Sequence, residues 1–565
     1  MAGPSRKWMI LVATIWIQAL TGTNFDFSAY SSEMKVALGV SQVQLNYLAT
    51  ASDLGKALGW TSGLALMWLP LWAVLFIASF MGLVGYGLQW AFLLGLFSPP
   101  YFLVFSLCLL AGCSISWFNT VCFVLCIKNF PANRALAISL TVSFNGVSAA
   151  LYALAANSIN PSSSSLYLLL NAVIPLLTSL AALIPILRQP ELDPLPPDDI
   201  KRDSLIFLFL NVLAVMTGLY LLFFTSSTNG LTCSRLLFGG AIFLLIFPTC
   251  VPGISYVREW FKQVHSGFRI DGSGFILVDD YDLEFHKELT TRGGSTMSLL
   301  IDGDGPSSFS LDGGKGEVCC ETVIAKDQLV MLGEEHSASL LVRRVDFWLY
   351  YVAYICGGTI GLVYSNNLGQ IAQSLGQSSS TTTLLTLYSS FSFFGRLLSA
   401  TPDYIRARKF YFARTGWLAL ALTPTPIAFF VLTSSGSVLA LQTGTALMGL
   451  SSGFIFAAAV SITSELFGPS SVGVNHNILI TNIPIGSLVY GLLAAIVYDS
   501  NSGSSHKIVM VTDTMICMGR QCYYWTFVLW GCLSLVGLVS SVVLFLRTRH
   551  AYRQFERDRI SSQLD

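Results

Sequence analysis

Charged residues are scarce in this chain of 565 residues, because Asp, Glu, Lys and Arg together make up only 11% of it. Soluble domains usually contain about 25% charged residues. The chain also has no net charge, since 31 Lys and Arg balance 31 Asp and Glu. Proteins that bind nucleic acid usually carry a basic excess. The composition therefore excludes an ordinary soluble domain and gives no indication of a nucleic-acid partner.

The sequence has little that could hold a metal ion or form a catalytic site. Its 12 Cys include no CxxC pair, and its six His fall mostly in predicted loops. Paired His, a Ser/His constellation and metal-ligand spacing are all missing, so we expect no metal, no cofactor and no enzymatic activity. Cys517 and Cys522 lie close together in a predicted outer loop, where they either form a disulfide bond or stay reduced.

Long apolar runs dominate what is present. Hydrophobic residues make up 53% of the chain, and the mean hydropathy is +0.64. A membrane-spanning helix needs about 20 mostly apolar residues. About fourteen segments satisfy this requirement, and they lie near 8–29, 44–65, 70–95, 101–126, 135–156, 165–187, 205–226, 234–254, 345–365, 383–401, 411–433, 436–462, 474–498 and 523–547. The continuous runs disfavour a β-barrel, whose strands alternate over about ten residues.

The distribution of basic residues sets the expected orientation. Cytoplasmic loops of membrane proteins are rich in Lys and Arg. With fourteen spans and a cytoplasmic N-terminus, the inside segments hold most basic residues, which include Arg6, Lys7, Lys128, Arg134, Arg188, Lys201, Arg202, Arg406, Arg408, Lys409, Arg414, Arg547, Arg549, Arg553, Arg557 and Arg559. We therefore expect both termini in the cytoplasm, in the plasma membrane or in a vacuolar or other endomembrane.

The predicted layout is two bundles of six spans with two inserted spans between them. A carrier built in this way holds its site at the midplane, between the two halves. The expected units are an N-terminal bundle, a linker with two inserted spans, a long polar cytoplasmic loop, a C-terminal bundle and a cytoplasmic tail, at 1–187, 188–254, 255–344, 345–547 and 548–565. The long loop is a candidate binding segment for regulatory proteins.

Three motifs resemble the plant nodulin-like (nuclear fusion defective 4-like) branch of the major facilitator superfamily. They are Ser52-Asp-Leu-Gly-Lys-Ala-Leu-Gly-Trp60, Gly85-Tyr-Gly-Leu-Gln-Trp90 and Gly369-Gln-Ile-Ala-Gln-Ser-Leu-Gly376. The resemblance covers nearly the whole chain and extends, more distantly, to oxalate/formate and monocarboxylate carriers. It implies the major facilitator fold and a transport function, but it assigns no substrate.

The gating motifs of that superfamily are unevenly kept. After the second span, the stretch Gly63–Trp72 retains only the glycine of the usual acidic and basic latch, whereas the second half keeps Gly395-Arg396 and further charges. The resemblance therefore predicts an asymmetric cytoplasmic latch. Its gating candidates are Arg134, Asp403, Arg406 and Glu465. A simply solvated helix end is the alternative for Glu465.

Charged residues inside spans are costly, by roughly 2.5 to 3.5 kcal/mol each at the helix centre on insertion scales, and therefore face a cavity or a partner. Asp53 and Lys56 lie three residues apart on one face of the second span. They form either a cavity-facing pair for coupling and substrate binding or a self-neutralising structural pair. Arg396 either attracts a carboxylate or braces the end of its helix.

The resemblance also predicts which spans line the cavity, namely the first and fourth of each bundle. Its remaining substrate-binding or coupling candidates are Asn24, Asp26, Asn119, Tyr354 and Gln442. Ordinary hydrogen bonding between helices is the alternative for each of them.

These features predict a secondary active transporter that moves a small solute, with an organic anion or monocarboxylate as the leading class and a proton as the candidate coupled ion. The alternative is a sensor or scaffold of the same fold that does not transport. Flux into vesicles under a pH gradient separates the two hypotheses.

Overall fold

The computed structural model describes residues 3–131, 133–161, 163–187, 197–225, 231–264, 329, 331–402, 412–468, 471–502, 509–511 and 514–562. Within these ranges twelve helices are long and apolar enough to cross a membrane. The predicted spans near 44–65 and 383–401 are also helical, but they do not meet that test. The first is divided between α3 (Gln42–Ala57) and α4 (Trp60–Ala65), and the second, α18 (Thr381–Leu398), is rich in Ser and Thr.

The first six predicted spans form one bundle. Besides α3 and α4 it contains α1 (Gly3–Thr21), η1 (Thr23–Asp26), α2 (Phe27–Leu38), α5 (Leu71–Leu93), α6 (Tyr101–Asn129), α7 (Arg134–Asn145), α8 (Ser148–Ile159) and α9 (Ser165–Ile186). The first span is longer than predicted, because the helical segment continues through η1 and α2 to Leu38. There Gly39 takes a φ of +60°, which side chains rarely adopt, and ends the helix.

The last six predicted spans form the second bundle. Besides α18 it contains α16 (Val345–Tyr354), a π-turn η3 (Ile355–Thr359), α17 (Ile360–Ser374), η4 (Ser378–Ser380), α20 (Arg414–Leu422), α21 (Pro424–Ser434), α22 (Val438–Phe467), α23 (Val472–Ile480), α24 (Asn482–Ser502) and α25 (Gln521–Ser562). A short helix, α15 (Ala338–Leu341), precedes it. Buried apolar side chains fill the interior of each bundle.

The insert consists of α10 (Pro197–Thr225), α11 (Leu231–Ile246), η2 (Phe247–Thr249) and α12 (Cys250–Val264). α11 packs on α8 and α12 on α1, so both helices lie against the first bundle. α10 contacts α18 of the second bundle, where Gly218 faces the ring of Phe393. A buried ion pair joins Lys7 to Asp203, and the Trp16 indole N–H donates to Leu245 O at 2.8 Å.

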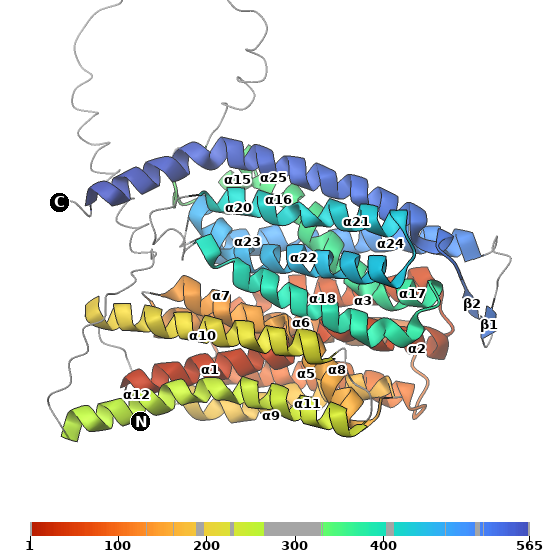
Figure 1. The fold of residues 1–565 in the computed structure, drawn as a ribbon, viewed down its shortest axis with the longest axis horizontal. Helices are drawn as coiled ribbons and strands as arrows, with labels where there is room; N and C mark the ends of the chain where they lie inside the picture. Colours follow the sequence, from red (N-terminus) through yellow and green to blue (C-terminus); the bar gives the residue numbers. More distant parts are fainter. Residues whose placement is uncertain are drawn as a thin grey trace, which may run out of the picture.

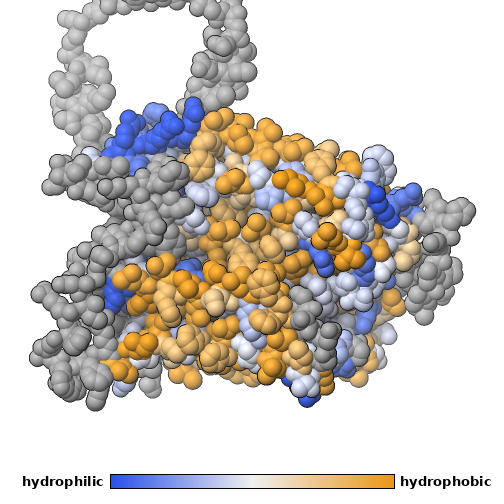
Figure 2. All heavy atoms as spheres, viewed as in Figure 1, coloured by the Kyte–Doolittle hydropathy of each residue, from blue (hydrophilic) through white to orange (hydrophobic). Residues whose placement is uncertain are grey.

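On the face drawn in Figure 2, a broad apolar belt lies between two more polar ends. α1 begins and α25 ends at one end, here called the termini end, while the short β1 (Val509–Val511) and β2 (Thr514–Ile516) lie at the opposite, hairpin end (Figure 1). A disulfide bond joins Cys517 to Cys522 at the hairpin end.

Two helices continue beyond the predicted ends of their spans. The long loop was expected from residue 255, yet α12 continues to Val264, because residues 254–264 contain neither Pro nor Gly. The tail was expected from 548, yet α25 continues to Ser562. Tyr552 and Phe555, three residues apart on one face, are buried against the second bundle and extend this helix beyond the apolar belt.

Candidate functional site

A central cavity of about 390 Å³ lies between the two bundles. Its lining comes from both halves, so a solute inside it contacts both. Five of the predicted candidates are among its lining residues: Asn24, Lys56, Asn119, Tyr354 and Arg396. Apolar and aromatic side chains form most of the remaining wall, as expected for a small-molecule site with a few orienting polar groups.

Contacts between the bundles separate this cavity from the hairpin end. α2 packs on α17, where the Gln370 amide donates to Ser31 Oγ at 2.9 Å. α3 packs on α24, where the Asn46 amide donates to Gly491 O at 2.9 Å. The lining extends the other way to Ile127, near the end of α6 at the termini end (Figure 1). The cavity therefore extends toward the termini end.

Arg396 supplies a buried positive charge to this cavity. Its side chain is 4% exposed, and its Nη1 donates to Val142 O at 3.3 Å. The guanidinium carbon lies 5.4 Å from the centre of the Phe25 ring and 5.7 Å from that of Phe456, which favours a cation between them. Its Nε has no hydrogen-bond partner within the described part of the chain. A buried donor without a partner is costly, so this nitrogen is suited to an anionic ligand.

The π-turn η3 follows Tyr354 directly, and such turns often occur at functional sites. It allows α16 and α17 to continue as one span while it changes the helical register. Thr359 in this turn donates to the Asn482 amide oxygen at 2.6 Å and so joins the span to α24.

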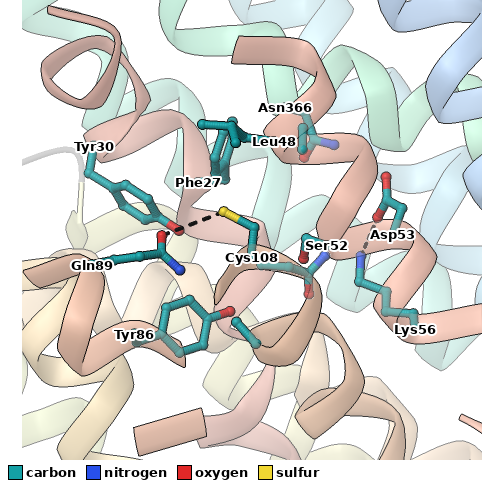
Figure 3. Close-up of a pocket in the computed structure, with 13 residues that line it drawn as sticks. Phe27, Tyr30, Leu48, Ser52, Asp53, Lys56, Tyr86, Gln89, Cys108 and Asn366 are labelled. Atoms are coloured by element: carbon teal, nitrogen blue, oxygen red, sulfur yellow. Dashed lines mark hydrogen bonds and ion pairs between the residues drawn. The ribbon is translucent and has the colours of Figure 1, made fainter. Parts of the chain in front are cut away.

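A small chamber of about 20 Å³ (Figure 3) adjoins the central cavity, since Asn24 and Lys56 line both. This volume is enough for about one water molecule. Within the chamber wall, Lys56 Nζ lies 2.6 Å from Asp53 Oδ1. The second oxygen, Asp53 Oδ2, accepts a hydrogen bond of 2.5 Å from Ser487 Oγ on α24. Asp53 thus joins a cation of its own helix to a hydroxyl of the other bundle.

Two predicted candidates lie elsewhere. Asp26 is buried inside the first bundle, where its Oδ1 accepts from the Asn171 amide at 3.0 Å, and it is not among the residues that line the cavity. Gln442 lies near the start of α22 and is not among them either. α22 instead contributes Phe456 and Val460.

The predicted gating residues are described in part. The Glu465 carboxylate accepts hydrogen bonds from Arg414 Nε at 2.9 Å and from the Tyr552 hydroxyl at 2.7 Å, so it joins α20, α22 and α25. Arg134 is the first residue of α7, and its side chain lies outside the described part. Asp403 and Arg406 also lie outside the described residues.

Sequence reasoning missed Asn145, His476 and Ser487. Asn145 and His476 line the cavity, and Ser487 binds Asp53. A histidine inside an apolar run is a signal that could have identified His476. Among the described residues, no group of three or more His, Cys, Asp and Glu is placed to hold a metal ion.

Two family models match the chain. The nodulin-like model covers residues 7–253, and the model of the NFD4 C-terminal domain covers residues 330–554. The chain is 57% identical to protein NUCLEAR FUSION DEFECTIVE 4 of Arabidopsis thaliana, over 99% of its own length and 92% of that protein. It is 27% identical to the probable transporter MCH1 of Yarrowia lipolytica, over 35% of this chain and 41% of that one.

Solved structures with a similar fold are transporters. A bacterial homologue of the lysosomal transporter Spinster, in an inward-facing conformation, matches with a TM-score of 0.54 at 10% identity over 99% of both chains. The peptide transporter POT in complex with sulfate matches with a TM-score of 0.54 at 13% identity, over 97% of this chain and 95% of that one. At these identities the likeness shows the fold alone.

Proposed function

Because this chain belongs to the nodulin-like family and has the major facilitator fold, we propose that it is a secondary active transporter that moves a small organic anion by alternating access. In such a carrier the two bundles rock about a site at the midplane. The cavity between the bundles, lined from both halves, supports this proposal.

The observation that carries the choice of an anion is Arg396. It is a buried guanidinium in the cavity with aromatic neighbours and an unsatisfied Nε. A monocarboxylate would supply the acceptor that this nitrogen lacks, and hydrogen bonds to charged groups contribute about 1.5 to 3 kcal/mol each. Asn119 and Tyr354, which line the same cavity, would orient the rest of the solute.

A proton is the proposed coupled ion, and Asp53 is the proposed proton site. In the described state Lys56 is neutralised by Asp53 and lines the cavity. Protonation of Asp53 removes this ion pair and frees the Lys56 ammonium for the anion. Protonation also converts the charged carboxylate that accepts the Ser487 hydrogen bond between the bundles into a neutral carboxyl group. Proton and anion would then move together.

The proposed topology has fourteen spans, with α3–α4 and α18 added to the twelve, and both termini in the cytoplasm. The disulfide at the hairpin end supports this orientation, because disulfides persist in oxidising compartments. The proposed units are the bundles at 1–187 and 345–547, the insert at 188–254, the cytoplasmic loop at 255–344 and the tail. The host is the plasma membrane or a vacuolar or other endomembrane, and tags at residue 300 and the C-terminus test the sidedness.

The long loop is a proposed binding segment for regulatory proteins, because the described residues at its C-terminal end contact helices next to the cavity. Gly333 N donates to Glu465 O at 2.8 Å, and Glu335 Oε2 accepts from Ser471 N at 3.0 Å. Ser471 precedes α23, whose first residues line the cavity. A sensor or scaffold of the same fold would use this connection without transport.

The test is uptake of radiolabelled lactate, pyruvate and acetate into proteoliposomes with an acidic exterior. We expect saturable, acid-stimulated uptake. Arg396→Gln should lower kcat/KM about 10- to 100-fold, since a lost charge-assisted hydrogen bond of about 1.5 to 3 kcal/mol corresponds to this range. Arg520→Gln, a basic residue outside the cavity lining, is the matched control.

Asp53→Asn should retain binding but remove the acid stimulation. Uptake that ignores both the pH gradient and Asp53→Asn would refute proton coupling. Uptake unchanged in Arg396→Gln would refute the anion site. Binding of a carboxylate without any flux would favour the sensor or scaffold.

A further inference from the structure

A second cavity, of about 240 Å³, lies between the bundles near the hairpin end. We call it the outer vestibule. α2, α8 and α9 line it from the first bundle, and α17 and α18 line it from the second, mainly through their ends at that side of the molecule (Figure 1). The contact between α2 and α17 separates it from the central cavity. In that contact a Cβ on Gly369 would lie 2.5 Å from Ser28 O, so the two backbones nearly touch.

The wall of the outer vestibule is rich in hydroxyl and amide groups. Its polar lining includes Ser28, Glu33, Asn157, Ser164, Gln373 and Thr382. Among the described residues that line it there is no Lys or Arg, and Glu33 is their one carboxylate. This composition disfavours an anion, so the vestibule differs in chemistry from the cavity that holds Arg396. Hydroxyls and amides both donate and accept hydrogen bonds, as the hydroxyls of a polyol do.

Two hydroxyl groups of this wall are buried without a partner. Ser28 is 3% exposed, and its Oγ has no hydrogen-bond partner within the described residues. Ser164 Oγ is also buried and has no hydrogen-bond partner within the described residues. Buried polar groups in folded proteins nearly always have a partner. Tyr167, whose aromatic side chain is buried, is another residue of this wall.

We propose that the outer vestibule binds a neutral polyhydroxylated molecule, such as a sugar, through Ser28, Ser164, Glu33 and the neighbouring amides. Both bundles contribute to the wall, so the site is complete only while their outer ends are together. A ligand that binds one conformation stabilises that conformation. The occupant therefore holds the hairpin end closed and slows the opening of the carrier on that side. This makes the vestibule a regulatory site separate from the transported anion.

The experiment is calorimetric titration of the purified full chain with glucose and with sorbitol. We expect a saturable heat in the wild type. Ser28→Ala and Glu33→Gln should each weaken binding about tenfold, because the first removes a hydroxyl group of the site and the second replaces a charged acceptor with a weaker neutral one. Ser106→Ala is the matched control, since the Ser106 hydroxyl donates to Phe102 O within its own helix and lies outside the vestibule.

Arg396→Gln distinguishes the two cavities. Sugar binding should survive this substitution, even if the anion-transport proposal fails. Loss of sugar binding in Arg396→Gln but not in Glu33→Gln would place the sugar in the central cavity and overturn the proposal. A heat that grows linearly with concentration, equal in wild type, Ser28→Ala and Glu33→Gln, would also overturn it. A linear heat that is equal in all three proteins is expected if the sugar acts only as a non-specific osmolyte, or if water alone occupies the vestibule.

Discussion

The hydrogen bond from Ser487 to Asp53 is a link between the bundles whose loss should open the hairpin end more often. Asp53 is 1% exposed, so solvent screens this bond little. Hydrogen bonds to charged groups contribute about 1.5 to 3 kcal/mol net. Asp53 keeps Lys56 as a partner after Ser487→Ala, so we use the lower value. About 1.5 kcal/mol corresponds to roughly a tenfold larger open fraction.

The assay measures how fast a membrane-impermeant thiol reagent, added from the hairpin side, labels Ser31→Cys. Ser31 is buried in the α2–α17 contact, so labelling requires that the outer ends separate. The labelling uses a variant in which Ala replaces each cysteine that is not fully buried or lies outside the described residues, namely Cys233, Cys250, Cys319, Cys320 and Cys532. Ser487→Ala should raise the labelling rate about tenfold, and saturating glucose should lower it.

The control is Ser500→Ala, the same change on the same helix, where the hydroxyl donates only to Val497 O of its own turn. A labelling rate in Ser487→Ala within twofold of that in Ser500→Ala would refute the reasoning. It would mean that the Ser487 bond persists equally in both conformations, or that other contacts alone determine closure.

Two further predictions concern stability. Gly112→Val should abolish the folded yield, measured by size-exclusion chromatography, because even a Cβ there would lie 1.9 Å from Ser52 O. Gly239→Val should fold normally, because no described atom beyond its own helix turn would lie within 4 Å of the Cβ. Asp346→Asn should lower the free energy of unfolding by about 3 to 5 kcal/mol, because it removes the negative charge that lies 2.6 Å from the buried Arg547 Nε. Combined Asp346→Leu and Arg547→Met should recover most of the thermal midpoint. A midpoint unchanged by Asp346→Asn, or a normal yield of Gly112→Val, would contradict these contacts.

The helices were largely predictable, because a run of about 20 apolar residues carries the signal by itself. The spans of α5, α6 and α9 agree with their predictions within a few residues. The ends were less predictable, since the polar part of α25 is stabilised by packing on the second bundle and not by its own hydropathy. The division of the second span into α3 and α4 was not predicted either.

The candidate site was predictable only where its signal is local. Asp53 and Lys56 share a helical face, and their spacing alone indicates the pair that the structure contains. Ser487 lies 434 residues from Asp53 in the chain, and nothing in its own surroundings distinguishes it from other serines in apolar helices. Asp26 was expected in the cavity because its span lines it, yet in the short turn η1 its carboxylate accepts a hydrogen bond from Asn171 inside the first bundle.

The inserted helices are attached unequally, and this restricts how the molecule can change shape. Lys7–Asp203 and Trp16–Leu245 fasten the insert to the first bundle, while α10 meets the second bundle where Gly218 faces Phe393. In the proposed alternating-access motion, the insert would move with the first bundle, and α18 would slide along α10. A bulky side chain at position 218 would clash with the Phe393 ring and hinder that movement.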